Sequence, residues 1–585
     1  MKNHDPYNGK IPDPKEIEKE IGEFLSKKFG GDVKIISPAT MPQNMSMEKS
    51  HGSSEKTGIN FDLKPEELIA YLDQYVVRQD QSKAILATKI CTHFNRIKHS
   101  EMFPDDANPL IGRIKNNVLM VGPTGVGKTY MIKLIAQKIG VPFVKGDATK
   151  FSETGYVGGD VEDLVRDLVR EADDDIELAQ YGIIYIDEID KIASSHNLVG
   201  ADVSRTGVQR ALLKPMEETE VDLKVPHDPI SMFQEIERFR KTGKREKNTV
   251  NTKNILFIMS GAFGELPEIV NKRLTDQGIG FGARLKGAQT EADILKQVRS
   301  EDLIEYGFES EFVGRLPVLA VLERLTETDL YDILKNPNNP VILGKKLDFG
   351  AYGIRVKFEN RALQILARQA FSENTGARGL VSAIERSLMP FERALPSSDI
   401  RIFPVTEAVI RDPHKALAEF LNDRDAADLF ATFERLAAEE KEFITAYVQE
   451  NKKILAEKHH LALTPSRIEV VADLYSQRTM DMGSVIRKVK SYSDEIKKME
   501  LYFFKSHDIN IVMEEDAIDY MIDRLINSNA DLDQFYKKLS SDFEHGLELV
   551  RERTGKNRFF INREALLDPE SFVSNLLKNC APTEP

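Results

Sequence analysis

The sequence predicts an α/β fold in which a parallel sheet flanked by helices is followed by a small α+β unit and a mostly helical C-terminal extension. Three observations predict this class. Short apolar runs of β type alternate with amphipathic helical stretches between residues 61 and 320, which is typical of a parallel sheet covered by helices. A glycine-rich loop follows one of these runs and opens a helix. An Asp-Glu pair follows another run.

Composition and charge bound the class of protein. A chain of 585 residues is too long for one hydrophobic core, and at roughly 150 residues per domain several domains are expected. Hydrophobic residues make up 41% and charged residues 30% of the chain, as in ordinary soluble globular proteins. The net charge of -14 repels polyphosphate backbones, so general nucleic-acid binding is disfavoured.

Cysteines and apolar runs bear on the compartment. Cys91 and Cys580 are the only cysteines and are far apart, so they can form neither a disulfide framework nor a four-cysteine zinc site. The N-terminus has no apolar stretch of signal-peptide length, and no run of about 18 apolar residues occurs anywhere. We therefore expect a cytoplasmic protein with no zinc and no membrane partner.

The first 60 residues predict a helix and a flexible linker. Residues 13–37 have the periodicity of a short amphipathic helix and a brief strand at its end. Residues 37–60 are rich in Ser, Pro, Met, Gly and Lys without periodicity, which is typical of a linker. Residues 61–320 are then expected to form the sheet domain, with strands and helices alternating at these runs: 118–121, 130–139, 143–144, 161–172, 183–186 and 255–259.

Residues 321–412 predict the smaller α+β unit. Helical periodicity begins at Leu322, a strand is expected at 354–358, and helices follow at 363–371 and 380–395. Residues 413–482 are expected to be wholly helical. Their apolar stripe covers too few heptads for a coiled coil, so packing against a neighbouring domain is expected.

Residues 483–585 contain an apparent degenerate copy of the small unit. The strand pattern at 353–359 has a counterpart at 508–515. Each is followed by two helices, a short β-type run and an Asp-Pro pair. Residue identity is low, so a true duplication and coincidental patterning both remain open.

The glycine-rich loop is a P-loop that predicts ATP binding. Its backbone N–H groups turn toward phosphates, and the following helix adds the partial positive charge of its N-terminus. Lys128 is expected to reach the β and γ phosphates, and Thr129 is expected to offer its hydroxyl to Mg²⁺. The predicted ATP-binding residues of this loop are Gly122, Pro123, Thr124, Gly125, Val126, Gly127, Lys128 and Thr129.

The acidic pair predicts ATP hydrolysis. The apolar run Ile183–Ile186 carries Asp187 and Glu188 to the end of a buried strand. Asp187 is expected to hold Mg²⁺ through water, and Glu188 is expected to polarise the attacking water in an in-line displacement on the γ phosphate.

A series of motifs resembles the ClpX and HslU family of AAA+ protein unfoldases, in the same order, across residues 62–410. The resemblance implies an AAA+ nucleotide-binding domain over 61–320, an AAA+ small domain over 321–412, and a ring that is expected to be a hexamer. The motifs begin at Phe151, Ile183, Asp202, Gly207, Ser260, Glu311 and Gly376.

The resemblance also implies roles for single residues. Tyr156 and Val157 correspond to the pore loop that grips an extended polypeptide, and an aromatic ring between glycines can press on almost any side chain. Arg315 corresponds to the arginine finger that reaches the neighbouring subunit's γ phosphate. Arg378 corresponds to the sensor-2 arginine that couples nucleotide state to domain rotation.

Two further segments concern the base pocket and a partner. Val76 and Val77 lie in a segment that resembles the family's adenine side, but Arg78 stands where the family generally has glycine. Ile279, Gly280 and Phe281 resemble the loop with which ClpX docks on the ClpP peptidase, a loop that HslU lacks. A ClpP-type peptidase is therefore an implied partner.

The departures from the family matter as well. ClpX begins with a four-cysteine zinc domain, which this chain lacks. Residues 226–252 form a longer basic segment than the loop found in ClpX, and a substrate-receiving collar and a solvated loop both remain open. The region beyond 413 has no counterpart in ClpX, and the apparent second copy lacks the Gly-Ala-Arg triplet that precedes Gly379.

The leading hypothesis is an ATP-dependent unfoldase and translocase that threads protein substrates through a ring, into a ClpP-type peptidase where one is bound. The alternatives are a remodeller of protein complexes that works without a peptidase and a DNA-associated AAA+ machine. The acidic charge argues against the last of these. No protease triad or HExxH motif occurs, so proteolysis would require a partner.

Overall fold

The computed structural model describes residues 62–102, 115–151, 159–193, 203–223, 249–276, 290–422, 426–528 and 532–578. The helix and linker predicted over residues 1–60 lie outside the described residues.

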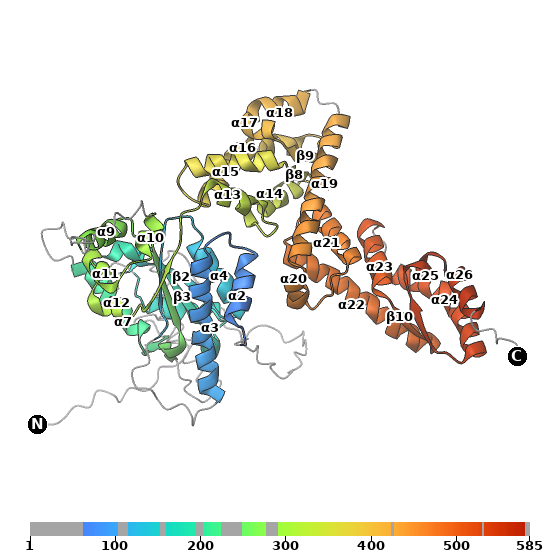
Figure 1. Ribbon diagram of the computed structural model, residues 1–585, viewed down its shortest axis with the longest axis horizontal. Helices are drawn as coiled ribbons and strands as arrows, with labels where there is room; N and C mark the ends of the chain where they lie inside the picture. Colours follow the sequence, from blue (N-terminus) through green and yellow to red (C-terminus); the bar gives the residue numbers. More distant parts are fainter. Residues whose placement is uncertain are drawn as a thin grey trace, which may run out of the picture. The chain divides into compact units, whose positions relative to one another are not determined.

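A five-stranded parallel sheet forms the centre of the first domain, in the order β2-β3-β6-β1-β7. Its strands are β1 (Val118–Val121), β2 (Phe143–Asp147), β3 (Ile183–Asp187), β6 (Leu256–Gly261) and β7 (Val318–Val321). The predicted α/β class is therefore confirmed, and the elements can be followed in Figure 1.

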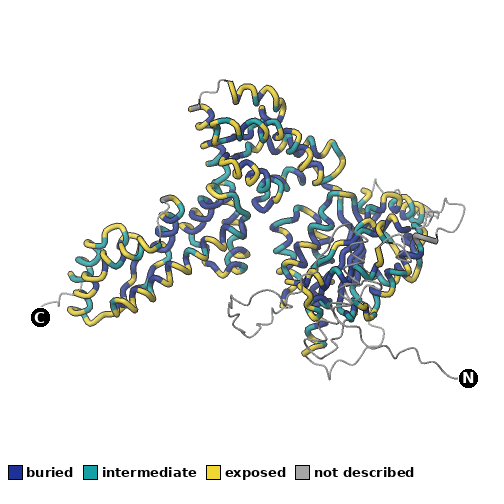
Figure 2. The backbone as a smooth tube through the Cα atoms, turned by 180° about the vertical axis from the view of Figure 1, so that it is seen from behind, coloured by how far each residue is buried: buried dark blue, intermediate teal, exposed yellow. Residues whose placement is uncertain are grey.

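Both faces of this sheet are buried, because successive side chains of a strand point to opposite faces. In β1, Val118 and Met120 belong to one hydrophobic core, whereas Leu119 and Val121 belong to another. Figure 2 shows the strands as buried segments. The first core includes α2 (Pro65–Asp73), α3 (Asp80–Met102) and α4 (Lys128–Ile139). The second core includes α5 (Asp163–Glu171), α6 (Ile176–Ala179), α7 (Val203–Met216), α9 (Leu266–Asp276), α10 (Glu291–Leu295), α11 (Ser300–Tyr306) and α12 (Ser310–Gly314).

Strand β7 has no counterpart in the sequence prediction, which begins helical periodicity at Leu322 directly after it. Residues Val318–Val321 pair with β1, and helix begins only at Glu327. A short apolar run cannot be distinguished from the start of a buried helix by periodicity alone. A second feature without a prediction is the antiparallel pair of β4 (Glu220–Asp222) and β5 (Thr249–Asn251), which brackets most of the basic segment.

The next elements form a unit of helices around two parallel strands, which we call the first α+β unit. Its strands are β8 (Arg355–Phe358) and β9 (Ile402–Val405). Its helices are α13 (Glu327–Lys335), α14 (Pro340–Gly350), α15 (Asn360–Ser372), α16 (Arg378–Ala394), α17 (Glu407–Arg411) and α18 (Pro413–Asn422).

Helix α19 (Ala426–Glu450) links two hydrophobic cores. It packs against β8, β9 and α21 (Pro465–Gln477). Leu429 near its start belongs to the core shared with the first α+β unit, whereas Ile444 and Val448 belong to the core of the C-terminal helices. The short helix α20 (Lys452–His459) follows.

The C-terminal elements repeat the order of the first α+β unit, and we call them the second α+β unit. Two parallel strands, β10 (Asn510–Met513) and β11 (Arg558–Ile561), again pair along their length. The helices are α21, α22 (Met482–His507), α23 (Glu515–Ser528), α24 (Leu532–Thr554), α25 (Arg563–Leu567) and α26 (Pro569–Lys578).

The local backbone also matches between the two units. Asp412 after α17 has φ -141 and ψ 82, and Asp568 after α25 has φ -137 and ψ 79. Each carboxylate accepts a hydrogen bond of 3.1 Å from the N–H three residues on. A true duplication explains these matches, and it remains our hypothesis. None of the helices in the described ranges is long and apolar enough to cross a membrane.

Candidate functional site

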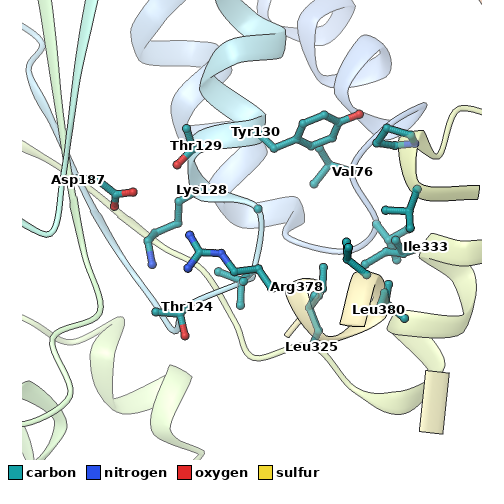
Figure 3. Close-up of a pocket in the computed structure, with 18 of the residues that line it drawn as sticks. Val76, Thr124, Lys128, Thr129, Tyr130, Asp187, Leu325, Ile333, Arg378 and Leu380 are labelled. Carbon is teal, nitrogen blue, oxygen red and sulfur yellow. The ribbon is translucent and has the colours of Figure 1, made fainter. Parts of the chain in front are cut away.

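One cavity of about 430 Å³ gathers the P-loop, the acidic pair and residues of the first α+β unit. Its volume lies within the range of small-molecule sites. Figure 3 shows Lys128, Thr129, Asp187 and Arg378 at one end, and the apolar side chains of Val76, Ile333 and Leu380 at the other. A cavity with one polar and one apolar end suits a ligand with a charged tail and a flat hydrophobic head.

The P-loop has the backbone shape that its glycines permit. Gly125 and Gly127 have φ of 75 and 94, a region that other L-residues rarely adopt. A Cβ on Gly125 would lie 2.1 Å from the carbonyl oxygen of Thr375. Gly127 is also the N-cap of α4, whose N–H groups at this end have no partner within the helix. The loop therefore presents an anion-binding helix end to the cavity.

Lys128 folds back over the P-loop. Its Nζ donates hydrogen bonds to the carbonyl oxygens of Gly122 at 2.5 Å and Pro123 at 2.9 Å. Burial lowers the pKa of Lys128 to about 8, although the nearby Asp187 and Asp190 carboxylates oppose this shift. Gly122 and Pro123 do not line the cavity themselves. Their carbonyl oxygens hold the Lys128 side chain, which does line it.

A hydrogen-bond network at the ends of β3 and β6 fixes Asp187. Its Oδ1 accepts a bond of 2.7 Å from Ser260 Oγ, and its Oδ2 lies 2.9 Å from Lys145 Nζ. Burial opposes the charged carboxylate, but these two bonds outweigh it, so the pKa of Asp187 lies below its usual value. The Asp187 carboxylate is therefore ionised at neutral pH.

The same network continues to Thr129 through Tyr185. The Tyr185 hydroxyl is 2.5 Å from Ser260 Oγ and accepts a bond of 3.1 Å from Thr129 Oγ1. Sequence reasoning did not assign a role to Tyr185, Ser260 or Lys145. The signal that could have found Tyr185 is a polar group within the otherwise apolar strand β3.

Glu188 adopts a backbone conformation that is uncommon for a residue with a side chain. Its φ of 57 and ψ of 33 lie in the left-handed region, which a non-glycine residue rarely occupies without a compensating constraint. The following 3-10 turn, Ile189–Ile192, and the buried Asp190 hold the position. Glu188 lines the cavity beside Asp187.

The first α+β unit closes the cavity through the segment before α16. Ala377 N–H donates a bond of 2.8 Å to the carbonyl oxygen of Gly125. Gly376 has φ of 61, and a Cβ there would lie 2.7 Å from the same oxygen. Arg378, the first residue of α16, points into the cavity toward Lys128 and Thr124 (Figure 3).

Arg315 lies outside this cavity. It follows α12 and forms an ion pair with Glu217. Its side chain is partly exposed, and it does not line the cavity. The structure therefore brings Arg378, but not Arg315, together with the P-loop of the same chain.

The base side of the cavity is lined by Tyr75, Val76 and Val77. Arg78 keeps the left-handed conformation, with φ of 60, that a glycine would favour here. Its guanidinium group is not in the cavity and instead bonds Glu323 Oε2 at 3.0 Å and Asp329 Oδ2 at 2.9 Å. Arg78 thus ties the base-side loop to the connection that leads into α13.

The C-terminal helices reach this loop from the outside. Lys458 Nζ of α20 donates a bond of 3.0 Å to Gln74 Oε1 and lies 4.7 Å from the centre of the Tyr71 ring. The Gln74 carbonyl oxygen accepts bonds from Asn336 and Asn338 at 3.0 and 3.1 Å. Gln74 therefore joins the sheet domain, the first α+β unit and the extension, a connection that sequence reasoning missed.

Several predicted residues lie outside the described residues. They are the pore-loop residues Tyr156 and Val157, the docking residues Ile279, Gly280 and Phe281, and most of the basic segment 226–252.

Comparisons with known proteins agree with this architecture. Residues 113–319 match the AAA domain (Cdc48 subfamily), and residues 325–391 match the C-terminal, D2-small domain of ClpB protein. The chain is similar to the "ATP-dependent Clp protease ATP-binding subunit ClpX" of Treponema denticola, with 40% identity over 337 residues. The match covers 57% of this chain and 77% of that relative.

Proposed function

The chain belongs to the ClpX family of AAA+ ATPases, and we propose from this premise that it unfolds proteins by pulling them through the pore of a ring. Its ATPase activity follows from the family. We propose in addition that the chain assembles into a ring, threads its substrates through the pore and binds a peptidase partner.

The observation that carries the proposal is the cavity shared by the P-loop and Arg378. Because its residues come from two units, a ligand bound there contacts both and favours the arrangement in which both contacts form. The Ala377 to Gly125 hydrogen bond shows how closely the two units approach at this point. Coupling between phosphate chemistry and domain movement is what a protein-pulling ATPase requires.

The residues present suit ATP and Mg²⁺. The adenine would lie among Val76, Val77 and Ile333, and the phosphates would lie at the N-terminus of α4. Lys128 would exchange its two carbonyl partners for phosphate oxygens. Oxygen ligands are what Mg²⁺ prefers, and Thr129 and Asp187 offer a hydroxyl and an ionised carboxylate held in one network.

Glu188 is proposed to orient the water that attacks the γ phosphate, since it lines the cavity next to Asp187. Arg378 would contact the same phosphates from α16. Arg315 is proposed to act on the nucleotide of the neighbouring subunit. Its position outside its own chain's cavity supports this role, because an arginine supplied in trans must be available at the surface.

Tyr156 and Val157 are proposed to grip the substrate in the pore, and Ile279, Gly280 and Phe281 are proposed to dock on a ClpP-type peptidase. The Treponema relative is an ATP-binding subunit of an ATP-dependent Clp protease by name, and this supports the second assignment.

The test is ATP-dependent loss of fluorescence from a stably folded, tagged reporter. Wild type is expected to unfold it and Glu188→Gln is expected to bind ATP without unfolding it. Reporter loss that becomes irreversible only with a ClpP peptidase would assign the chain to a protease, and Phe281→Ala should then abolish degradation but not unfolding. Hydrolysis by wild type without unfolding of a range of reporters would contradict the proposal and favour a dedicated remodeller of protein complexes.

A further inference from the structure

The two α+β units expose the outward faces of their strand pairs differently. Both pairs are parallel, and both are flanked by the same backbone bonds. Arg355 N–H donates to Arg401 O and Glu359 N–H donates to Val405 O in the first unit. Asn510 N–H donates to Asn557 O and Glu514 N–H donates to Ile561 O in the second. The strand positions of the two units can therefore be compared one by one.

In the first unit, α19 covers the outward face. The Arg355 guanidinium lies 5.2 Å from the centre of the Phe433 ring, and Phe433 is buried. Lys357 forms an ion pair with Glu440 of α19 and donates a bond of 2.8 Å to the carbonyl oxygen of Ser476. Lys357 and its neighbour on β9, Pro404, are both buried.

In the second unit, the same face is open within the described residues. Val512 and Phe560 occupy the positions of Lys357 and Pro404 and are direct neighbours across the strands. Phe560 is 51% exposed. Arg558 is also exposed, and its guanidinium group lies 5.2 Å from the centre of the Phe560 ring. A phenylalanine is exposed to solvent where the first unit has a buried proline.

We propose that the open strand face, formed by Val512, Arg558 and Phe560, is a docking site for an amphipathic helix of a partner protein. The first unit shows the binding mode, because α19 lies on the equivalent strands. The chain's own α19 is already held by Lys346, Lys357 and the contacts with α21. The same holds for α19 of any second copy, and we commit to a helix from another protein as the occupant.

The chemistry of the face defines that helix. The stripe of α19 on the first unit is Leu429, Phe433 and Leu436, an i, i+4, i+7 pattern typical of helix-in-groove recognition. Because Val512 replaces Lys357, the partner should carry an apolar residue where α19 has Glu440. An acidic residue beside the stripe would pair with the exposed Arg558.

The test uses the full chain and a display library of 25-residue peptides, the length of α19, with apolar residues fixed at i, i+4 and i+7. A second library has the same composition with apolar residues at alternating positions. Enriched peptides are measured by fluorescence anisotropy against wild type, Phe560→Asp and Phe430→Asp. Phe430 is the matched control, since it is 53% exposed and lies on α19.

Peptides of the helical library should bind wild type, weaken about tenfold or more with Phe560→Asp, and bind Phe430→Asp as they bind wild type. Arg558→Glu leaves the apolar residues in place and should weaken the binding of peptides with an acidic flank. This variant provides the test if circular dichroism shows that Phe560→Asp is unfolded. The proposal would be overturned if no peptides were enriched. It would also be overturned if peptides bound the folded Phe560→Asp and Arg558→Glu variants as tightly as they bind wild type. Concentration-dependent self-association that Phe560→Asp abolishes would also overturn it, because the occupant would then be a second copy. None of these measurements depends on unfolding activity.

Discussion

In the first α+β unit, α16 begins at Arg378, and the two residues before it lie against the P-loop. In the second unit, the equivalent helix α24 begins at Leu532, and no Gly-Ala-Arg triplet precedes it. The strand pairs and the order of helices are the same. The segment before α16 is therefore one difference between two units that share the same order of strands and helices.

The cover over the strands gives the largest expected difference between the two units. Glu440 accepts ion pairs from the buried Lys346 and Lys357, so Glu440→Ala leaves two ammonium groups without their acid. Removing one partner of a buried pair costs about 3 to 5 kcal/mol. Thermal unfolding should show this loss. Glu495→Ala, a change at an exposed position of α22, is the control and should leave the unfolding temperature unchanged.

The ion pairs of Glu440 with Lys346 and Lys357 also predict that stability depends on pH. Burial opposes the charged form of Glu440, but the two lysines outweigh it and hold its pKa below the usual 4.5. Its contribution to stability is therefore present above pH 4.5 and is lost as the pH falls through its folded-state pKa. As the pH is lowered from about 5 to 3, the urea concentration at the midpoint of unfolding should decrease in wild type. The part of this decrease that Glu440 causes should be absent in Glu440→Gln. An identical pH profile for both proteins would contradict the assignment.

Substitution of Arg378 at the start of α16 is expected to have the next largest effect. Loss of a hydrogen bond to a charged group costs about 1.5 to 3 kcal/mol, so Arg378→Ala should lower ATP turnover by about 10-fold to 100-fold. Gln534→Ala in the equivalent turn of α24 should leave turnover unchanged. Arg386→Ala, on the exposed side of α16, controls for loss of any arginine from that helix. Equal losses from Arg378→Ala and Arg386→Ala would refute a direct role of Arg378.

A smaller effect is expected where the extension meets the base-side loop. Lys458 bonds Gln74 and lies over Tyr71 and Tyr75, and a contact of this kind is worth about 0.5 to 2 kcal/mol. Lys458→Met keeps the apolar stem and should raise the KM for ATP by about 2-fold to 30-fold. Lys488→Met, which faces Tyr492 in the second unit, should not change it.

The smallest effect is expected at Arg78. Its ion pairs with Glu323 and Asp329 are partly exposed, and such pairs contribute about 0 to 1 kcal/mol. Arg78→Gly keeps the left-handed turn and removes the tie to α13. Turnover should change by no more than about 5-fold. Arg78→Val should have a larger effect, because a β-branched residue does not tolerate φ of 60.

Much of the fold and of the cavity could be predicted because local signals were strong. Gly125 and Gly127 indicate a phosphate loop by their spacing, and the strand before Asp187 is apolar throughout its buried part. The strands of the second unit were found at Arg558 to Ile561 because their pattern repeats that of the first. Strand β7 was not found, because four apolar residues do not reveal a period.

The contacts that join distant segments could not be predicted. Tyr185, Ser260 and Lys145 meet only because β2, β3 and β6 are neighbours in the sheet. Gln74 and Lys458 are far apart in the chain, and nothing in either segment indicates the other. The open strand face could not be predicted either, since Phe560 lies within the apolar run at residues 559–561, which the sequence alone would place in a core.

The most direct test of the central claim measures hydrolysis and reporter unfolding together in wild type and in Tyr156→Ala. Wild type should unfold the reporter while it consumes ATP, and Tyr156→Ala should consume ATP at a similar rate without unfolding. Unfolding by Tyr156→Ala at the wild-type rate, or hydrolysis by wild type without unfolding of any tagged reporter, would contradict the account.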